Sequence, residues 1–246
     1  MNWHQKYAPK TLDDVILPPR IKNALSTMRT HHYSEHLLFS GATGVGKTTT
    51  ATVLSPRNTD LLNVAMDRKV EDVDHIKKML HSRNLFEPAT RRIVVVDEAD
   101  HFSAAMQKAL KGILDGVPEA DGYGRLVITS NNPMNLIAPL RSRLYCIDFN
   151  LTPEELAMVS DQFRRRLCEI ADAEGFTAEN EVIDAAMRYA PDFRKVIQTF
   201  AIESLTRQCA PDSQASRMVT ARLSIAQESQ VQKQREANLD IVVLAE

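Results

Sequence analysis

A glycine-rich segment between a strand-like run and a helical pattern constrains the fold of this chain more than any other feature. Residues 41–48 read Gly-Ala-Thr-Gly-Val-Gly-Lys-Thr, which fits the pattern G-x-x-x-x-G-K-[ST]. Glycines let successive backbone N–H groups turn inward around phosphates, and a helix N-terminus adds positive potential. The alternative is a chance glycine turn with a surface lysine, but the strand–loop–helix context favours a phosphate-binding loop. The residues expected to bind the nucleotide are Thr43, Gly44, Val45, Gly46, Lys47, Thr48 and Thr49.

Two carboxylates add hydrolytic chemistry to this loop. Lys47 would reach the β- and γ-phosphates, and the Thr48 hydroxyl would ligate Mg²⁺. Asp97 and Glu98 end the β-branched run 92–97, at the edge of an open α/β sheet where ligands bind. Asp97 would hold Mg²⁺ through water, and Glu98 would orient and polarise the attacking water. Acids at a strand end are often turn or N-cap residues, but next to a phosphate loop they predict hydrolysis.

Asn131 ends the next strand-like run, in the sequence Ser-Asn-Asn-Pro at residues 130–133. Its side-chain amide could touch the γ-phosphate or the attacking water. A simple Asn-Pro turn is the alternative, and spacing alone does not decide between the two.

Apolar runs alternate with helical patterns through residue 150, which predicts a parallel α/β sheet flanked by helices. Five strands are expected, at residues 36–40, 62–66, 92–97, 126–130 and 145–149. The helices expected between them lie at residues 47–54, 72–83 and 103–114, with Ser103 as the cap of the last.

After Asn150 the pattern predicts helices alone. The first begins with a capping box at Thr152-Pro153-Glu154-Glu155, and the three helices are expected at residues 152–174, 179–189 and 192–205. The predicted organisation is an α/β ATPase core over residues 1–150, a three-helix lid over 151–207 and a polar tail over 208–246.

Composition restricts the class of protein further. The 246 residues are 43% hydrophobic and 25% charged, as in ordinary globular proteins. No apolar run is long enough to span a membrane and the N-terminus lacks a signal-peptide core, so we expect no membrane partner. The three cysteines are far apart, which argues against a disulfide framework or a zinc site and predicts a cytoplasmic location. A net charge of −2 does not indicate a nucleic-acid binder.

Several motifs together resemble the AAA+ ATPases and, within them, the ATPase subunits of sliding-clamp loaders. The chain is similar to replication factor C small subunits and, more closely, to the large subunit of phage clamp loaders. The opening segment 5–14 resembles the K-Y-R-P-x-T-[IL]-D-[DE] segment of that family, although Ala8 replaces its arginine. Residues 139–144 resemble its P-L-x-S-R-C motif, with Leu144 in place of cysteine, and residues 191–195 resemble its second-sensor motif.

The resemblance implies roles that spacing alone could not. Arg143 would be an arginine finger for a neighbouring subunit's ATP site, and Asn131 would be the first sensor. Arg194, on the lid, would be the second sensor. Val15 and Ile16 would lie against the adenine, although the sequence that follows departs from the pattern of cellular members. The implied cofactors are ATP and Mg²⁺, and the implied partners are a sliding clamp, primer–template DNA and other loader subunits, in a bacterial or phage-infected host cytoplasm.

DNA contact is implied by the same resemblance. Lys108 and Lys111 are spaced i, i+3 on one predicted helix and so share a face. They are candidates for contacts with the DNA backbone, and a solvated polar face is the alternative.

The family usually adds a third helical collar domain, for which the polar residues 208–246 are too few. The chain alone is therefore expected to be largely monomeric. Two other functions stay open: another AAA+ remodeller such as a helicase loader, and a nucleotide-dependent binding subunit without turnover.

Overall fold

The computed structural model describes residues 3–31, 35–54, 59–62, 70–82, 92–118 and 123–208. The elements in chain order are α1 (Trp3–Lys6), α2 (Pro19–Thr30), β1 (Leu37–Ser40), α3 (Lys47–Val53), β2 (Thr59–Leu62), α4 (Val70–His81), β3 (Ile93–Val96), η1 (Ala99–His101), α5 (Ala104–Leu114), β4 (Arg125–Ser130), η2 (Pro133–Asn135), α6 (Ala138–Arg141), β5 (Tyr145–Asp148), α7 (Pro153–Ala173), α8 (Asn180–Met187) and α9 (Phe193–Gln208).

A five-stranded parallel sheet with strand order β2-β3-β4-β1-β5 lies at the centre of the first part of the chain. Strands β1, β3 and β4 are buried along their whole length, which explains why their sequences are continuous apolar runs rather than alternating ones. The prediction of a five-stranded parallel sheet flanked by helices is confirmed. Because β1, β3 and β4 pair parallel as neighbours, their carboxyl ends lie at the same edge of the sheet.

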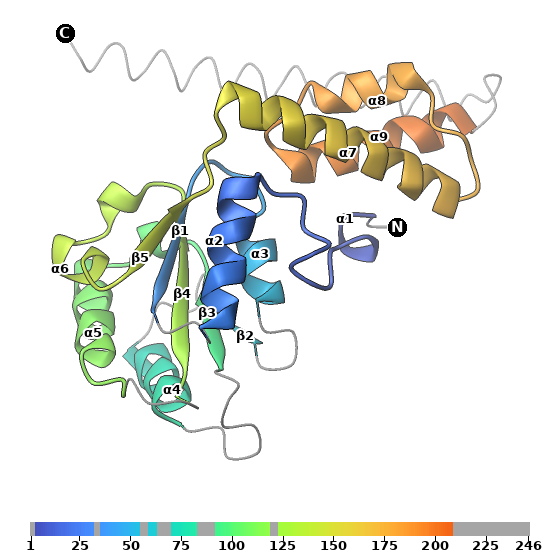
Figure 1. Cartoon of the computed structure of the whole chain (residues 1–246). Helices are drawn as coiled ribbons and strands as arrows, with labels where there is room; N and C mark the ends of the chain where they lie inside the picture. The colour runs from blue at the N-terminus through green and yellow to red at the C-terminus, as the bar shows by residue number, and fades with distance from the viewer. Residues whose placement is uncertain are drawn as a thin grey trace, which may run out of the picture.

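Two hydrophobic clusters hold helices against the two faces of this sheet. One joins α4 and α5 to alternate residues of the strands, such as Val94 and Ile128. The other joins α2 and α3 to the opposite residues, such as Val95 and Val127. Figure 1 shows these helix pairs on either side of the strands. The sheet is therefore the middle layer of an α/β/α sandwich.

Two expectations about this layer need correction. The second strand, expected at residues 62–66, lies at Thr59–Leu62, and residues 63–69 are outside the described part of the chain. Its position is set by backbone pairing with β3, from Thr59 opposite Ile93 to Leu62 opposite Val96, and not by its apolar content. Helix α2 is not among the helices expected from the sequence; Pro19 occupies its first position, where a missing N–H costs no helical hydrogen bond.

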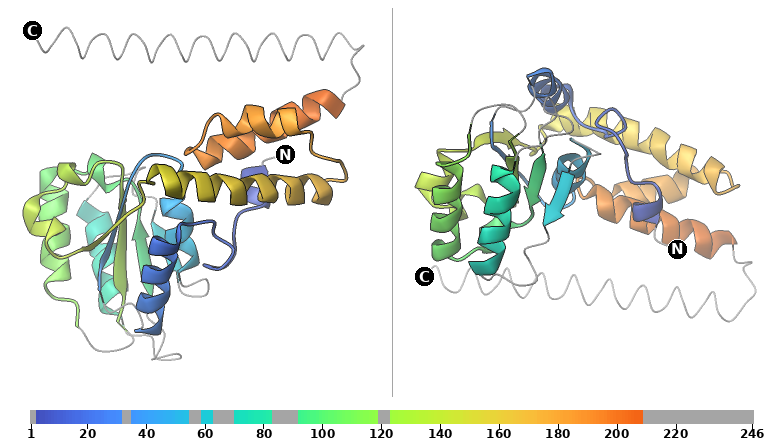
Figure 2. Two further views of the ribbon diagram at one scale, coloured as in Figure 1. Left: turned by 45° about the horizontal axis from the view of Figure 1, so that its top comes forward. Right: turned by 90° about the horizontal axis from the view of Figure 1, so that it is seen from below.

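The helices after β5 form a separate hydrophobic cluster. Helix α7 begins with the predicted capping box between Thr152 and Glu155. The side chain of Phe163 on α7 stacks on Phe193 at the start of α9, with ring centroids 3.9 Å apart. Both rings belong to the cluster that unites α7, α8 and α9. Figure 2 shows the three helices packed side by side, away from the sheet.

The beginning of the chain packs on these late helices rather than on the sheet. Trp3 is 3% exposed and contacts the rings of Phe176 and Phe200. Tyr7 donates a hydrogen bond to Glu174 over 2.8 Å, and Lys6 pairs with the same carboxylate at 2.7 Å. The N-terminal segment therefore connects the helical part to the sheet, and the domain boundary at residue 150 stays a prediction.

Arg20 fixes the linker between the sheet and the helices. Its guanidinium pairs with both carboxylate oxygens of Glu155, at 3.0 and 3.2 Å. It also donates to the carbonyl oxygens of Asp148 and Asn150, at 2.7 and 3.1 Å. One side chain of α2 thus holds the end of β5, the linker and the start of α7 together.

Candidate nucleotide-binding site

The phosphate loop, residues 41–48, crosses the carboxyl edge of the sheet between β1 and α3. Gly46 has φ = 95° and precedes the first residue of α3, a left-handed conformation that a side chain would strain. Thr50 then donates its backbone N–H to the Gly46 carbonyl over 2.8 Å, which closes the first helical turn. The loop therefore directs the N-terminus of α3 at a pocket lined by Thr43 to Thr49.

Lys47 is buried at the base of this pocket, with 7% of its surface exposed. Its ammonium donates to the carbonyl oxygens of Gly41 and Ala42, both at 2.7 Å, and to Asn131 Oδ1 at 2.9 Å. Burial lowers the pKa of Lys47, while the carboxylates of Asp97, Asp100 and Glu98 oppose that shift. The structure thus brings Lys47 and Asn131 together, as the adjacent positions of β1 and β4 require.

Asp97 lies just beyond β3 and faces the start of α3. Its Oδ1 accepts hydrogen bonds from the hydroxyl groups of Thr48, at 2.7 Å, and Thr129. A hydroxyl and a carboxylate oxygen at the mouth of a phosphate loop are the hard oxygen donors that Mg²⁺ prefers. The residues present therefore fit the predicted ion, and Thr48 and Asp97 would hold it.

Glu98 follows in an unusual backbone conformation. Its φ of 54° and ψ of 45° are left-handed, and it is the one non-glycine residue with positive φ in the described part of the chain. Its backbone N–H donates to Thr129 Oγ1 over 3.0 Å, and its carbonyl accepts from the His101 N–H at 3.1 Å. Strained residues of this kind are held by their surroundings and cluster at functional sites. Glu98 lines the pocket beside Asp97.

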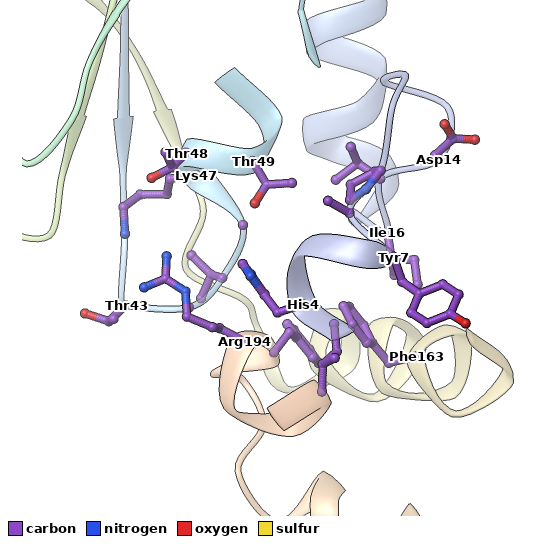
Figure 3. A pocket seen from close by; sticks show the side chains of 18 of the residues that line it. His4, Tyr7, Asp14, Ile16, Thr43, Lys47, Thr48, Thr49, Phe163 and Arg194 are labelled. Atoms are coloured by element: carbon purple, nitrogen blue, oxygen red, sulfur yellow. The ribbon is translucent and has the colours of Figure 1, made fainter. Parts of the chain in front are cut away.

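The helical part closes the pocket from the opposite side. Phe193 donates its backbone N–H to the Gly44 carbonyl over 3.2 Å, so α9 begins in contact with the phosphate loop. Asp192 lies so close to Gly44, which has φ = 80°, that a Cβ there would come within 2.8 Å of the Asp192 Cα. Arg194 is the second residue of α9, and Figure 3 shows its side chain directed at the phosphate loop beside Thr43 and His4.

The other end of the pocket is apolar and aromatic. In Figure 3, Ile16, Tyr7 and Phe163 lie at the end of the pocket away from Lys47. Val15 is buried and Ile16 half-buried, and both line the pocket, where the predicted adenine contact would occur. The remaining lining residues outside the loop and the acidic pair are His4, Ala8, Pro9, Asp14, Thr129, Asn131, Arg166, Ile170, Phe193 and Ile197.

Three of the residues singled out in the sequence are not part of the described pocket lining: Arg143, Lys108 and Lys111. Lys108 is exposed and Lys111 half-exposed on α5. Lys111 pairs with Asp115 at 2.5 Å, and the Arg143 Nε pairs with the same carboxylate. These two cations lower the pKa of Asp115 to about 2, Arg143 being the stronger influence. Lys111 and Arg143 therefore belong to one surface cluster away from the pocket.

Sequence reasoning missed several residues that the fold brings to this pocket. Thr129 faces Asp97 because Ile128 pairs with Val96 on the neighbouring strand, and that register requires the strand order. His4 lines the pocket from α1, where burial and then the charge of Arg194 lower its pKa, against the charge of Asp192. A local pattern in the sequence signals neither residue.

Comparison with known proteins agrees with this geometry. The sequence is 33% identical over 205 residues to the replication factor C small subunit of Natronomonas pharaonis, an alignment covering 79% of this chain and 60% of the relative. It is 29% identical over 234 residues to replication factor C small subunit 2 of Pyrobaculum islandicum, covering 90% of this chain and 70% of the relative. The chain thus spans three fifths of the length of the first relative.

A solved structure shares the fold. The Thermotoga maritima RuvB Holliday junction branch migration motor superimposes with a TM-score of 0.63 over 89% of this chain and 72% of that one, at 20% identity. Residues 37–151 match the family described as "ATPase family associated with various cellular activities (AAA)". That range runs from β1 through β5 and contains the phosphate loop, Asp97, Glu98 and Asn131. The chain therefore contains an AAA-family ATPase domain over residues 37–151, and its sequence is similar to replication factor C small subunits over most of its length.

Proposed function

We propose that this chain is an ATP-hydrolysing motor subunit of a sliding-clamp loader. The observation that carries the proposal is the pocket itself, where one sheet edge gathers Lys47, Asp97 and Glu98 below the start of α9. The names of the relatives, replication factor C small subunits, support the loader over other AAA-family functions.

The chain's own side chains divide the work within the pocket. Lys47 would exchange its carbonyl partners for β- and γ-phosphate oxygens, and Asn131, which accepts from Lys47 at 2.9 Å, would report on the γ-phosphate. Glu98 would orient and polarise the attacking water. Arg194 would add positive charge from the helical side as the second sensor. Bound Mg²⁺, held at Thr48 and Asp97, would neutralise charge on the phosphates.

Arg143 would act on a neighbouring subunit. It lies outside the described lining of its own pocket, and the family places its finger arginine at this motif position. A finger of this type contributes about 10³–10⁵ in rate by neutralising transition-state charge. The proposal therefore includes partner subunits, homo- or hetero-oligomeric, whose ATP site this residue completes.

The proposed partners beyond the other subunits are a ring clamp and primer–template DNA. Lys108 and Lys111, exposed and half-exposed on α5, are the candidates for contacts with the DNA backbone. Helix α5 lies on the face of the sheet opposite α2 and α3 (Figure 1). The two relatives described above are archaeal, so the phage and bacterial setting stays a prediction. Within the described residues, every helix is too short or too polar to cross a bilayer.

Steady-state ATP hydrolysis tests the proposal. Turnover of the chain with its partner subunits is measured alone, with primer–template DNA, and with DNA plus the sliding clamp of the same genome. Stimulation that needs both clamp and DNA is the expected result. Stimulation by a replicative helicase in place of the clamp would identify a helicase loader. Tight ATP binding with no turnover under any of these conditions would identify a binding subunit.

A further inference from the structure

Thr129 connects both acidic residues of the pocket to the adjacent strand. It is the fifth residue of β4 and is 1% exposed. Val96 of β3 pairs with Ile128 of β4 in a parallel register. The next residues along the two strands, Asp97 and Thr129, therefore also lie opposite each other. The Thr129 side chain is therefore placed between β3 and β4 at the point where the catalytic acids leave the sheet.

The hydroxyl of Thr129 is both a hydrogen-bond donor and an acceptor. It donates its proton to Asp97 Oδ1 and accepts the backbone N–H of Glu98 over 3.0 Å. The Thr129 side chain is buried, whereas Asp97 is half-buried and Glu98 is exposed at the pocket. Loss of this one hydroxyl would remove the protein acceptor of the Glu98 N–H and one of the two hydroxyl donors to Asp97 Oδ1.

The bond to the Glu98 N–H bears on the orientation of the catalytic carboxylate. Glu98 has left-handed backbone angles, which a non-glycine residue adopts only when neighbouring contacts hold it there. Two backbone hydrogen bonds do so: the one to Thr129 and the one from His101 to the Glu98 carbonyl. The bond to Thr129 is therefore one of two backbone contacts that hold Glu98 in these angles.

We infer that Thr129 is a positioning residue for hydrolysis, which fixes Glu98 in its strained conformation and orients Asp97 toward Thr48. The inference rests on the proposed ATPase function and identifies a residue that acts through the two carboxylates. ATP affinity should depend little on it, because Thr129 makes no described hydrogen bond to Lys47 or to the phosphate loop.

Three substitutions separate the hydroxyl from the shape of the side chain. Thr129→Val keeps the β-branched shape and removes the hydroxyl, whereas Thr129→Ser keeps the hydroxyl. We expect Thr129→Val to lower kcat by about ten- to a hundredfold, as expected for the loss of one or two kcal-scale hydrogen bonds in the transition state, with the ATP Kd unchanged within about twofold. Thr129→Ser should retain most of the turnover. Thr129→Ala replaces the valine variant if the latter does not fold.

A matched control removes a buried hydroxyl elsewhere. Ser204 on α9 is 5% exposed and its Oγ is without a hydrogen-bond partner in the described structure, so Ser204→Ala should leave kcat unchanged. In a Glu98→Gln background, Thr129→Val should lower the residual kcat by less than it does in the unchanged chain, because the part of its effect that acts through Glu98 is already lost. Equal kcat for Thr129→Val and the unchanged chain, equal impairment of the serine and valine variants, or multiplicative losses in the Glu98→Gln background would each overturn the inference.

Hydrogen exchange at the Glu98 amide tests the contact without relying on turnover. The amide should be protected in the unchanged chain and in Thr129→Ser, and should exchange at least about tenfold faster in Thr129→Val, since its acceptor is gone. Equal protection in all three would refute the positioning role even if the chain hydrolyses ATP. Loss of protection in a chain that never turns over would refute the proposed function and leave the contact established.

Discussion

The ammonium group of Lys47 has three acceptors within the protein, and two of them are carbonyls of its own loop. An ammonium carries three donors, so a phosphate oxygen that binds Lys47 must replace one of these bonds. The exchange is favourable because a charged acceptor forms a stronger hydrogen bond than a neutral carbonyl. The loop therefore keeps the lysine satisfied and buried in a position from which it can turn to phosphate.

Replacement of this lysine should abolish tight nucleotide binding. We expect Lys47→Ala to raise the Kd for Mg-ATP by on the order of a hundredfold, since one charge-assisted interaction with phosphate contributes about 1.5–3 kcal/mol. Fluorescent ATP-analogue titration measures the effect. Lys108→Ala removes an exposed lysine of α5, outside the described pocket, and should leave the Kd unchanged. Equal ATP affinities of the Lys47→Ala and Lys108→Ala variants would show that Lys47 does not bind the phosphates.

Position 44 requires glycine for the space around it as well as for its backbone angles. A methyl group at this position would meet Asp192, and α9 would have to move off the phosphate loop. Gly44→Ala should therefore weaken ATP binding and speed hydrogen exchange at the start of α9, where the Phe193 N–H now donates to Gly44.

Gly175 provides the matched control for this substitution. It has φ = 82°, close to the 80° of Gly44, but open space around its Cβ position. Gly175→Ala should lower the free energy of unfolding by about 1 kcal/mol from backbone strain alone and leave the ATP Kd unchanged. If the two alanine variants lost the same ATP affinity, contact between α9 and the loop would have no part in binding.

The surface cluster of Lys111, Asp115 and Arg143 predicts how stability depends on pH. Asp115 lies just after α5 and pairs with Lys111 and with Arg143, which together hold its pKa at about 2. A depressed carboxyl pKa favours the folded state above the pKa of the unfolded chain, and this contribution is lost as the pH falls through about 2 to 4.

NMR titration of the Asp115 carboxyl measures this pairing directly. In Arg143→Ala the pKa of Asp115 should rise toward its ordinary value near 4 while staying below it, because Lys111 remains. An unchanged pKa of Asp115 in that variant would show that Arg143 does not pair with it in solution.

Local signals in the sequence were sufficient for the parts of the structure that depend on neighbouring residues. The phosphate loop, the buried strand that ends at Asp97, and the capping box at Thr152 were predicted because glycine angles, β-branched runs and cap hydrogen bonds act over a few positions. The extent of β2 was wrong because strand pairing sets it. Thr129 was missed because its role depends on the partner strand.

Some site residues were predicted only by resemblance. Arg194 lines the pocket because α9 docks on Gly44, more than a hundred residues away in sequence, and composition or periodicity offers no signal of that contact. The placement of Val15 and Ile16 in the same pocket also depends on the packing of the N-terminal segment, Val15 in the cluster of α2, α3 and the sheet and Ile16 against the late helices. Their functional roles stay predictions.

For the molecule as a whole, the location of Arg143 predicts a site shared between subunits. Arg143→Ala should leave the ATP Kd of the isolated chain unchanged and stop turnover in the assembly, since the residue is outside the described lining of its own pocket. Mixing Arg143→Ala with Glu98→Gln should restore part of the activity, because some interfaces then pair an intact arginine with an intact acid. Mixtures as inactive as each variant alone would exclude a shared site.

The burial of Trp3 among the last helices has a consequence for the order in which the molecule is made. Its contacts, Phe176 and Phe200, are synthesised more than 170 residues later, so Trp3 can become buried only after those residues have left the ribosome. A nascent chain that ends at residue 150 would contain the phosphate loop and the acidic pair but would lack the helices that complete the pocket. We therefore expect tight nucleotide binding only after α9 has been synthesised.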